Sequence, residues 1–133
     1  MPNLVTKIQK ANDFACLGSV TDDQISFAEK ALHLTFSDDF KEYLRPFGTA
    51  TFDGKELTGI CPSDRLNVVT VTQHARNFYN NFPMEAYVIE ELLLDHLLII
   101  QKTNGVIYSF GPDNSETKIA DSLIDYLFPN DKY

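Results

Sequence analysis

The apolar residues of this 133-residue chain change their spacing near Thr49, and no other feature of the sequence limits the fold as strongly. Before Thr49 they recur every three or four residues, as on one face of a helix. After Thr49, short runs rich in β-branched and aromatic residues alternate with glycine-containing turns and favour strands. N-terminal helices, an antiparallel meandering sheet and a closing C-terminal helix predict an α+β fold rather than a doubly wound parallel sheet.

Three helices are predicted before residue 49, and each follows a side chain that can accept a hydrogen bond from the first turn: Asn3, Thr21 and Ser37. Thr21 and Gln24 have the spacing of a capping box, in which each side chain binds the backbone amide of the other residue. Pro46 and Gly48 are expected to end the third helix. This part of the chain is therefore predicted to be helical from local signals alone.

The remainder of the chain is predicted to contain mostly strands. Asp53-Gly54 indicates a turn between short strands at residues 50–52 and 56–60, and Asn104-Gly105 is typical of a hairpin. Four further runs have strand-like composition: residues 86–90, 97–101, 106–110 and 117–119. These strands are expected to form the meander.

Two segments beside these strands need a separate interpretation. Residues 68–79 contain β-branched residues that prefer strands, yet the segment is framed like a helix, so both interpretations stay open. Near the end of the sequence, Asp121 or Ser122 is expected to cap a final amphipathic helix that Pro129 ends. A length of 133 residues is typical of one domain, and we expect residues 1–133 to form it.

The charge of the chain limits the kinds of partner that it can bind. Nineteen acidic residues oppose eleven basic ones, which gives a net charge of −8. Such a surface repels nucleic-acid phosphates and anionic lipids, so neither is expected as a direct partner. A basic protein surface is the complementary partner.

The sequence contains no pattern typical of export or of membrane insertion. The first residues lack the basic and then apolar order of a secretory signal, and the apolar run at residues 92–100 is too short to span a bilayer. Cys16 and Cys61 are far apart in the sequence and form no CxxC pair, which favours two reduced cysteines. We therefore expect a cytoplasmic protein.

No residue pattern indicates catalysis, a metal ion or a cofactor. His33, His74 and His96 lack the spacing of a metal-binding motif, and no glycine-rich phosphate loop is present. A catalytic dyad requires only that Cys61 and His74 meet in space, but a small buried hydrophobic residue is the better interpretation of Cys61. We therefore predict that the protein is not an enzyme and has no catalytic residue, cofactor or metal.

Paired acidic residues have two interpretations. Asp22-Asp23 and Asp38-Asp39 are most simply residues that favour the positive ends of helices. Glu90 and Glu91 are successive residues of a strand, so their side chains point to opposite faces of the sheet and one of them faces away from the core. That charge, with Asp95 nearby, is either a solubilising edge charge or part of an acidic docking surface.

The order of these motifs resembles the SUKH superfamily, which includes bacterial immunity proteins and fungal Smi/Knr-type regulators of cell-wall synthesis. The resemblance begins with three segments: Gly18 to Ile25, Ala28 to Leu32 and Phe36 to Leu44. It continues through Leu57-Thr58-Gly59-Ile60, Val106-Ile107-Tyr108 and Ile119 to Leu123. The chain departs from the family pattern at two turns, where Thr35-Phe36 replaces the usual Leu-Pro and Phe47-Gly48 replaces Asn-Gly. The chain is also similar to YobK-type single-domain members of bacilli.

The resemblance implies an α+β domain that binds and neutralises a toxin, often a nuclease, without catalysis of its own. A regulatory scaffold related to the cell-wall regulators is the alternative. A nuclease must have a basic cleft to hold phosphates, and the charge of −8 is complementary to such a cleft. The resemblance transfers no binding residue, because partners differ between members of the family.

Candidate partner-binding residues therefore come from charge and loop position alone. Seven acidic residues are candidates for the docking surface: Asp53, Glu56, Asp64, Glu90, Glu91, Asp95 and Asp113. Three tyrosines are candidates for apolar anchors: Tyr79, Tyr87 and Tyr108. Charge is expected to accelerate the encounter, and buried aromatic anchors are expected to slow dissociation.

Overall fold

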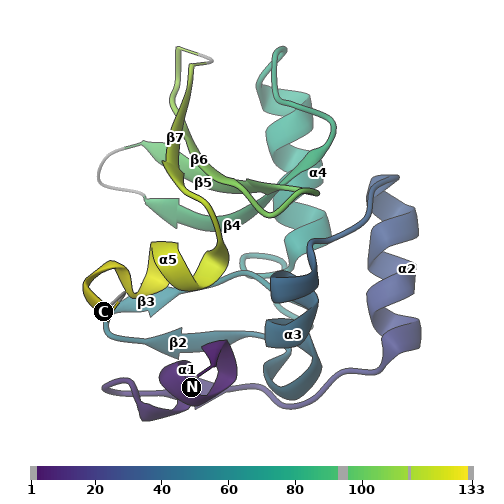
Figure 1. Ribbon diagram of the computed structural model, residues 1–133. Helices are drawn as coiled ribbons and strands as arrows, with labels where there is room; N and C mark the ends of the chain where they lie inside the picture. Colours follow the sequence, from purple (N-terminus) through teal and green to yellow (C-terminus); the bar gives the residue numbers. More distant parts are fainter. Residues whose placement is uncertain (1–2, 93–95, 114, 132–133) are drawn as a thin grey trace.

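The computed structural model describes residues 3–92, 96–113 and 115–131, and it has the α+β architecture that the sequence predicts (Figure 1). The helices are α1 (Leu4–Lys10), α2 (Asp22–Leu32), α3 (Asp38–Phe47), α4 (Val68–Phe78), α5 (Leu123–Leu127) and a 3-10 turn at Pro129–Asp131. The strands are β1 (Ala15–Cys16), β2 (Ala50–Phe52), β3 (Lys55–Glu56), β4 (Ala86–Leu92), β5 (Leu97–Lys102), β6 (Ile107–Phe110) and β7 (Glu116–Ala120).

The first three helices begin at the predicted capping residues. Thr21 and Gln24 form the complete capping box, with the Gln24 amide 3.1 Å from the Thr21 hydroxyl and the Thr21 amide 2.8 Å from Gln24 Oε1. The end of α3 differs from the prediction, because Pro46 lies inside its last turn. Gly48 ends the helix with φ of +68°, and a Cβ atom there would lie 2.7 Å from the Gly18 carbonyl oxygen.

The segment that sequence alone leaves open, residues 68–79, is helical: Val68–Phe78 forms helix α4. The Asn67 side chain accepts hydrogen bonds from the amides of Val69 and Thr70, at 3.0 and 3.2 Å, and thereby caps the helix. Val71 and Ala75 are buried at helical spacing, while Gln73, between them, is exposed. The amphipathic spacing and the cap together outweigh the strand preference of the β-branched residues.

The strands form two antiparallel sheets, where the sequence predicted one meander. The smaller sheet has the order β1-β2-β3, and the larger has the order β4-β5-β6-β7, which is the predicted meander. Thr58 connects them, because its amide donates to the Ile89 carbonyl at 2.9 Å and its hydroxyl donates to the Val88 carbonyl at 2.7 Å. The sequence did not predict β1, which contains only two residues.

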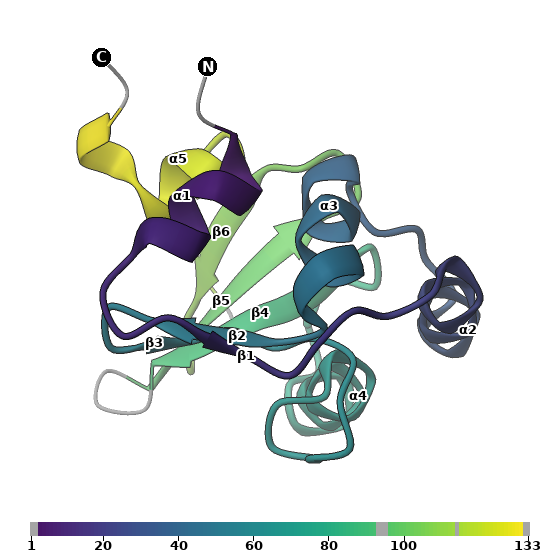
Figure 2. The same ribbon diagram turned by 90° about the horizontal axis from the view of Figure 1, so that it is seen from below.

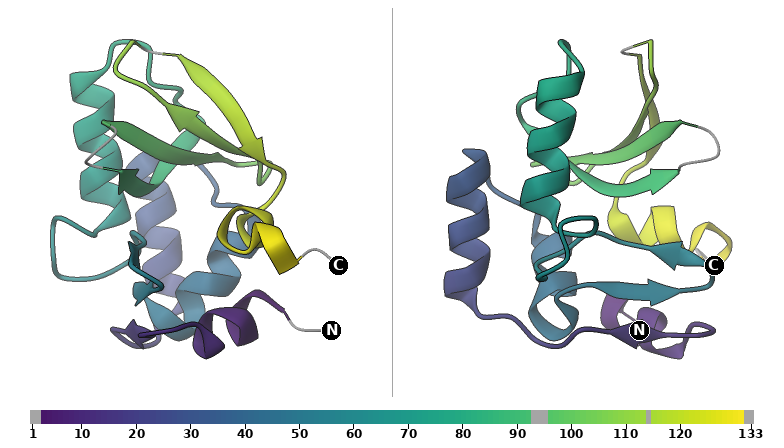
Figure 3. Two further views of the ribbon diagram at one scale, coloured as in Figure 1. Left: turned by 90° about the vertical axis from the view of Figure 1, so that its left-hand side faces the viewer. Right: turned by 180° about the vertical axis from the view of Figure 1, so that it is seen from behind.

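The helices cover the two faces of the larger sheet unequally. Helices α1, α3 and α5 lie on one face, and α4 lies on the other, as the view from below shows (Figure 2). Helix α2 stands beside α4 (Figure 3). Arg76 of α4 joins this helix to α2 and to the segment before β4, because its guanidinium donates to the carbonyls of Leu32 at 2.8 Å and Met84 at 3.0 Å.

An aromatic cluster forms the centre of the core between α3 and the larger sheet. The Phe40 ring packs against Phe36, Tyr43 and Tyr87, with ring centroids 5.1, 5.5 and 5.0 Å away. The Tyr87 hydroxyl accepts from the Ser37 amide at 3.0 Å and donates to Gln101 Oε1 at 2.7 Å. Since Tyr87 has no exposed surface, its prediction as a partner anchor is wrong. Burial raises the pKa of Tyr87 well above its usual value.

Candidate protein-binding surface

A shallow hollow lies where α4 packs against the larger sheet, and we call it the α4 groove. Its volume is about 150 Å³. Its lining comes from α4 and the residue after it, from β4 and from β5: Val71, His74, Ala75, Phe78, Tyr79, Glu91 and Leu98. Apolar side chains form most of this lining. The right-hand view of Figure 3 shows α4 lying across this face of the sheet.

Strand register explains why Glu91 reaches the α4 groove and Glu90 does not. Glu91 is paired with Leu98, which also lines the groove, whereas Glu90 is paired with Ile99 of the main core. Successive side chains of a strand point to opposite faces. The prediction that one of the two glutamates faces away from the core is confirmed, because Glu91 is exposed.

Glu90 is buried, so its prediction as part of an acidic docking surface is wrong. It has 5% of its surface exposed, and the Tyr126 hydroxyl of α5 donates a hydrogen bond to its carboxylate. The Lys55 ammonium lies 3.8 Å from the same carboxylate and 5.0 Å from the centroid of the Tyr126 ring. Burial, together with this hydrogen bond, raises the pKa of Tyr126. Glu90 therefore joins β3, β4 and α5 inside the protein.

Aromatic rings form one side of the α4 groove. Phe78 is 71% exposed, and its ring lies 4.9 Å from the ring of Tyr79. Tyr79 in turn packs edge-on against the buried Phe110 at 5.3 Å. Exposed aromatic rings beside an apolar hollow are typical of the places where binding energy concentrates in protein interfaces. Tyr79, a predicted anchor, therefore lies in a suitable position.

Sequence reasoning missed Phe78. The residue follows Val71 and Ala75 at helical spacing, so the apolar pattern predicts that it is buried. It is the last residue of α4 and is 71% exposed, so its apolar spacing does not decide its burial. No local signal in the sequence indicates that the last apolar residue of the helix is exposed.

Arg65 interacts with two acidic side chains near the α4 groove, Glu56 directly and Glu91 at longer range. Its guanidinium binds both carboxylate oxygens of Glu56 at 2.8 Å, and this pairing lowers the pKa of Glu56. The charge of Glu91 also contributes to the raised pKa of Arg65, after the larger effect of Glu56. Among the described residues, no cation lies within ion-pair distance of Glu91. Glu91 is thus the acidic residue of the groove lining, and the exposed Asp64, which precedes Arg65 in the chain, adds a negative charge beside the Glu56–Arg65 pair.

The other candidate residues lie elsewhere. Asp53 is in the turn between β2 and β3, where its carboxylate accepts from the Asn12 amide at 3.1 Å. Asp113 follows β6, and hydrogen bonds from the Ser115 hydroxyl and amide lower its pKa. Tyr108 is half-buried, with the Lys102 ammonium 4.4 Å from its ring. Asp95 lies outside the described residues.

The described part of the chain contains no group of three or more histidine, cysteine, aspartate or glutamate side chains able to hold a metal ion. No helix formed by the described residues has both the length and the apolar composition required to cross a membrane.

The comparisons with known proteins give one family. The SUKH_5 model, described as SMI1-KNR4 cell-wall, matches residues 1–129. No curated protein matches the chain. The resemblance predicted from the sequence is thus confirmed for the superfamily, whereas the similarity to YobK-type members stays a prediction.

Proposed function

The chain belongs to the SMI1-KNR4 cell-wall family of the SUKH superfamily, and on this premise we propose that it is an immunity protein that neutralises a cognate toxin. The superfamily is known for immunity proteins and also has members related to the cell wall, and its members are generally non-enzymatic binding proteins. Binding of another protein is the property that both groups share.

The observation that carries the proposal is the α4 groove. It combines a strongly exposed aromatic ring, an apolar floor and a carboxylate that has no cation within ion-pair distance among the described residues. This combination fits a partner surface that presents an apolar side chain next to a lysine or arginine. The apolar side chain would fill the hollow beside Phe78, and the cation would pair with Glu91.

A nuclease toxin has the right chemistry for such a partner. Its substrate cleft must be positively charged in order to bind phosphates, and the immunity protein has a net charge of −8. In our proposal the acidic side of the α4 groove, formed by Glu56, Asp64 and Glu91, docks at the edge of that cleft and excludes the nucleic acid. Long-range attraction speeds the encounter, and burial of Phe78 and Tyr79 slows dissociation.

Neutralisation by occlusion needs no bond-making step in the immunity protein. We therefore propose that the chain is not an enzyme and acts in stoichiometric amounts. We also propose a cytoplasmic location, where a nuclease toxin would otherwise reach its substrate.

The decisive experiment is co-expression with the product of the neighbouring reading frame. We expect that product to stop growth when expressed alone, and the immunity protein to restore growth and to co-purify with it. A neighbouring product that is toxic but forms no complex with this chain would contradict the proposal. A harmless neighbouring product would favour the regulatory scaffold.

Two substitutions locate the binding surface. Phe78→Ser removes the exposed ring, and Glu91→Lys reverses the unpaired charge; we expect each to weaken the complex by about tenfold or more. Glu42→Lys on α3 makes the same charge change away from the groove and serves as the matched control. Equal effects of Glu91→Lys and Glu42→Lys would remove the α4 groove from the proposal and leave only general charge attraction.

A further inference from the structure

Strand β7 is an open edge of the larger sheet. It pairs with β6 on one side and, within the described residues, with no strand on its other side. Residues 116–119 are all exposed. The outer edge of such a strand offers unpaired amide and carbonyl groups, to which an extended chain can pair.

The charged residues of β7 do not protect this edge in the usual way. Charged side chains on an edge strand normally discourage pairing with another chain. Here Glu116 is held by the Lys102 ammonium at 2.8 Å, and Lys118 is held by Asp121 at 2.7 Å. Both charges are therefore compensated within the protein, which lowers the barrier to an incoming strand.

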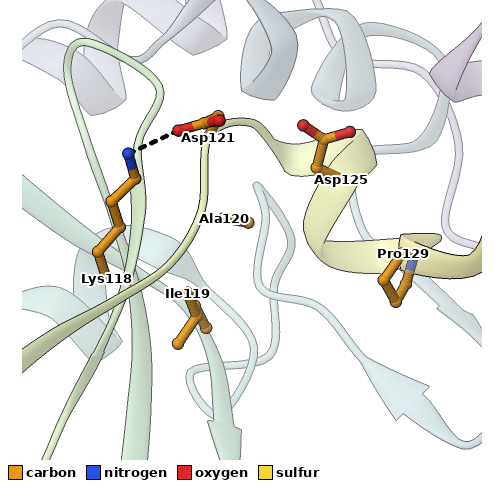
Figure 4. A pocket seen from close by; sticks show the side chains of 6 residues that line it. All are labelled: Lys118, Ile119, Ala120, Asp121, Asp125 and Pro129. Carbon is orange, nitrogen blue, oxygen red and sulfur yellow. Dashed lines mark ion pairs between the residues drawn. The ribbon is translucent and has the colours of Figure 1, made fainter. Parts of the chain in front are cut away.

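A hollow of about 390 Å³ lies at the C-terminal end of β7, and we call it the β7 hollow. Its lining is contributed by the end of β7 and by α5 with the turn that follows: Lys118, Ile119, Ala120, Asp121, Asp125 and Pro129. Figure 4 shows Asp121 and Asp125 on one side of the hollow and Ile119 and Pro129 on the opposite side. The hollow thus has an apolar wall and a polar wall, on which Lys118 pairs with Asp121 and Asp125 adds a second carboxylate.

A register shift orients Ile119 at this place. Tyr108 is paired with Lys118, but the preceding residue, Ile107, is paired with Ala120, so Ile119 has no partner across the ladder. Bulges of this kind change the direction of a side chain at the edge of a sheet. Ile119 is 43% exposed, so part of its apolar side chain is open to a partner.

We propose that β7 and the β7 hollow bind an extended, basic segment of a partner protein, which adds a strand to the larger sheet and places a lysine or arginine in the hollow. The methylene stem of that residue packs on Ile119 and Pro129, and its charged end pairs with the carboxylate of Asp125, because Asp121 is already paired with Lys118. The backbone of the segment pairs with the open edge of β7.

Charge decides between a basic segment and a second copy of this chain. Two copies would each have a net charge of −8, and their association through β7 would bring these charges together. A basic segment is attracted by the same charge. This surface is separate from the α4 groove, and the inference does not depend on the identity of a toxin.

A short synthetic peptide of alternating lysine and valine is the probe. We expect it to shift the backbone amide resonances of residues 116–121 of the full chain in a titration followed by NMR. A second peptide, with a central valine replaced by proline, keeps the charge but cannot complete the strand ladder, and we expect it to bind about tenfold more weakly. Equal binding of the two peptides would overturn the proposal, because charge alone would then explain it.

Variants of the protein test the β7 hollow itself. Asp125→Asn and Ile119→Ser change half-exposed or exposed side chains, so both are expected to fold. Each should weaken binding of the lysine-valine peptide by about fivefold to tenfold, whereas Glu42→Gln on α3, the matched control for Asp125→Asn, should leave the peptide's affinity unchanged. Amide shifts that move with Glu42→Gln instead, or a concentration-dependent dimer that shifts the β7 amides without peptide, would overturn the proposal.

Discussion

The two faces of the larger sheet have different roles, and the difference shows how this small protein combines stability with recognition. The face toward α1, α3 and α5 contributes Tyr87, Ile89, Ile99 and Ile107 to a large core cluster. The face toward α4 contributes to a much smaller cluster that ends at the α4 groove. One face is packed against the large aromatic and aliphatic core cluster, whereas the other leaves aromatic rings and charges at the surface.

The largest predicted effect comes from alkaline pH and concerns the first face. Burial raises the pKa of both Tyr43 and Tyr87 above the usual tyrosine value of about 10. A phenol with a higher pKa in the folded state contributes its full share of stability below pH of about 10 and loses it as the pH rises toward that higher value. We therefore expect cooperative unfolding above a pH of about 10.

Circular dichroism and tyrosinate absorbance, recorded in one titration, check this expectation. The signal of the folded backbone should disappear as the buried phenols ionise. A sample unfolded in denaturant supplies the absorbance of free tyrosines as the control. If every tyrosine ionised while the chain kept its native circular dichroism, the claim that the buried phenols stabilise the first face would be contradicted.

Truncation of one aromatic residue on each face gives the next largest effects. Phe40→Ala should lower the free energy of unfolding by about 3–5 kcal/mol, because three rings surround Phe40 and cannot close the cavity. Phe110 is equally buried, but its ring contacts Tyr79 and Phe82, which belong to the smaller cluster on the α4 side of the sheet. We expect Phe110→Ala to lower the free energy of unfolding by about 3 kcal/mol or less. Urea denaturation measures both free energies, and equal losses would contradict the difference in packing between the two faces.

The cap of α4 gives a smaller effect. Asn67→Ala removes the acceptor for the amides of Val69 and Thr70, and it should cost about 1 kcal/mol of stability. Asn67→Asp keeps an acceptor and serves as the control, although it loses the donor to the Cys61 carbonyl. Hydrogen exchange should show the loss of protection mainly in α4. A loss spread evenly over α3 and the larger sheet would show that the two faces unfold as one unit.

The parts of the fold that the sequence predicted correctly depend on local interactions. The caps at Thr21 and Ser37 and the turn at Asn104-Gly105 act within a few residues, so they can be read without knowledge of the fold. The sequence left the structure of residues 68–79 undecided because their β-branched residues prefer strands, and the Asn67 cap together with packing of the apolar face against the sheet decides for the helix.

The site was harder to predict because it depends on register and on where elements end. Tyr87 and Glu90 were chosen for charge or aromatic character, but both point into the core side of β4. The register shift between Val88 and Glu90 determines which glutamate reaches the surface, and the sequence carries no signal for it. Phe78 was missed for the opposite reason, since its spacing indicates burial.

The smallest predicted effect on stability belongs to the residue expected to matter most for binding. Phe78 is 71% exposed at the last position of α4, so Phe78→Ser should change the free energy of unfolding by no more than about 0.5 kcal/mol. Denaturation in urea measures this value, with Asn67→Ala as the reference for a change that does weaken α4. A loss above about 1 kcal/mol would show that the Phe78 ring stabilises the helix and is not exposed only to bind a partner. A near-neutral value, combined with the expected loss of toxin binding, would show that an exposed aromatic ring is kept on this face for recognition.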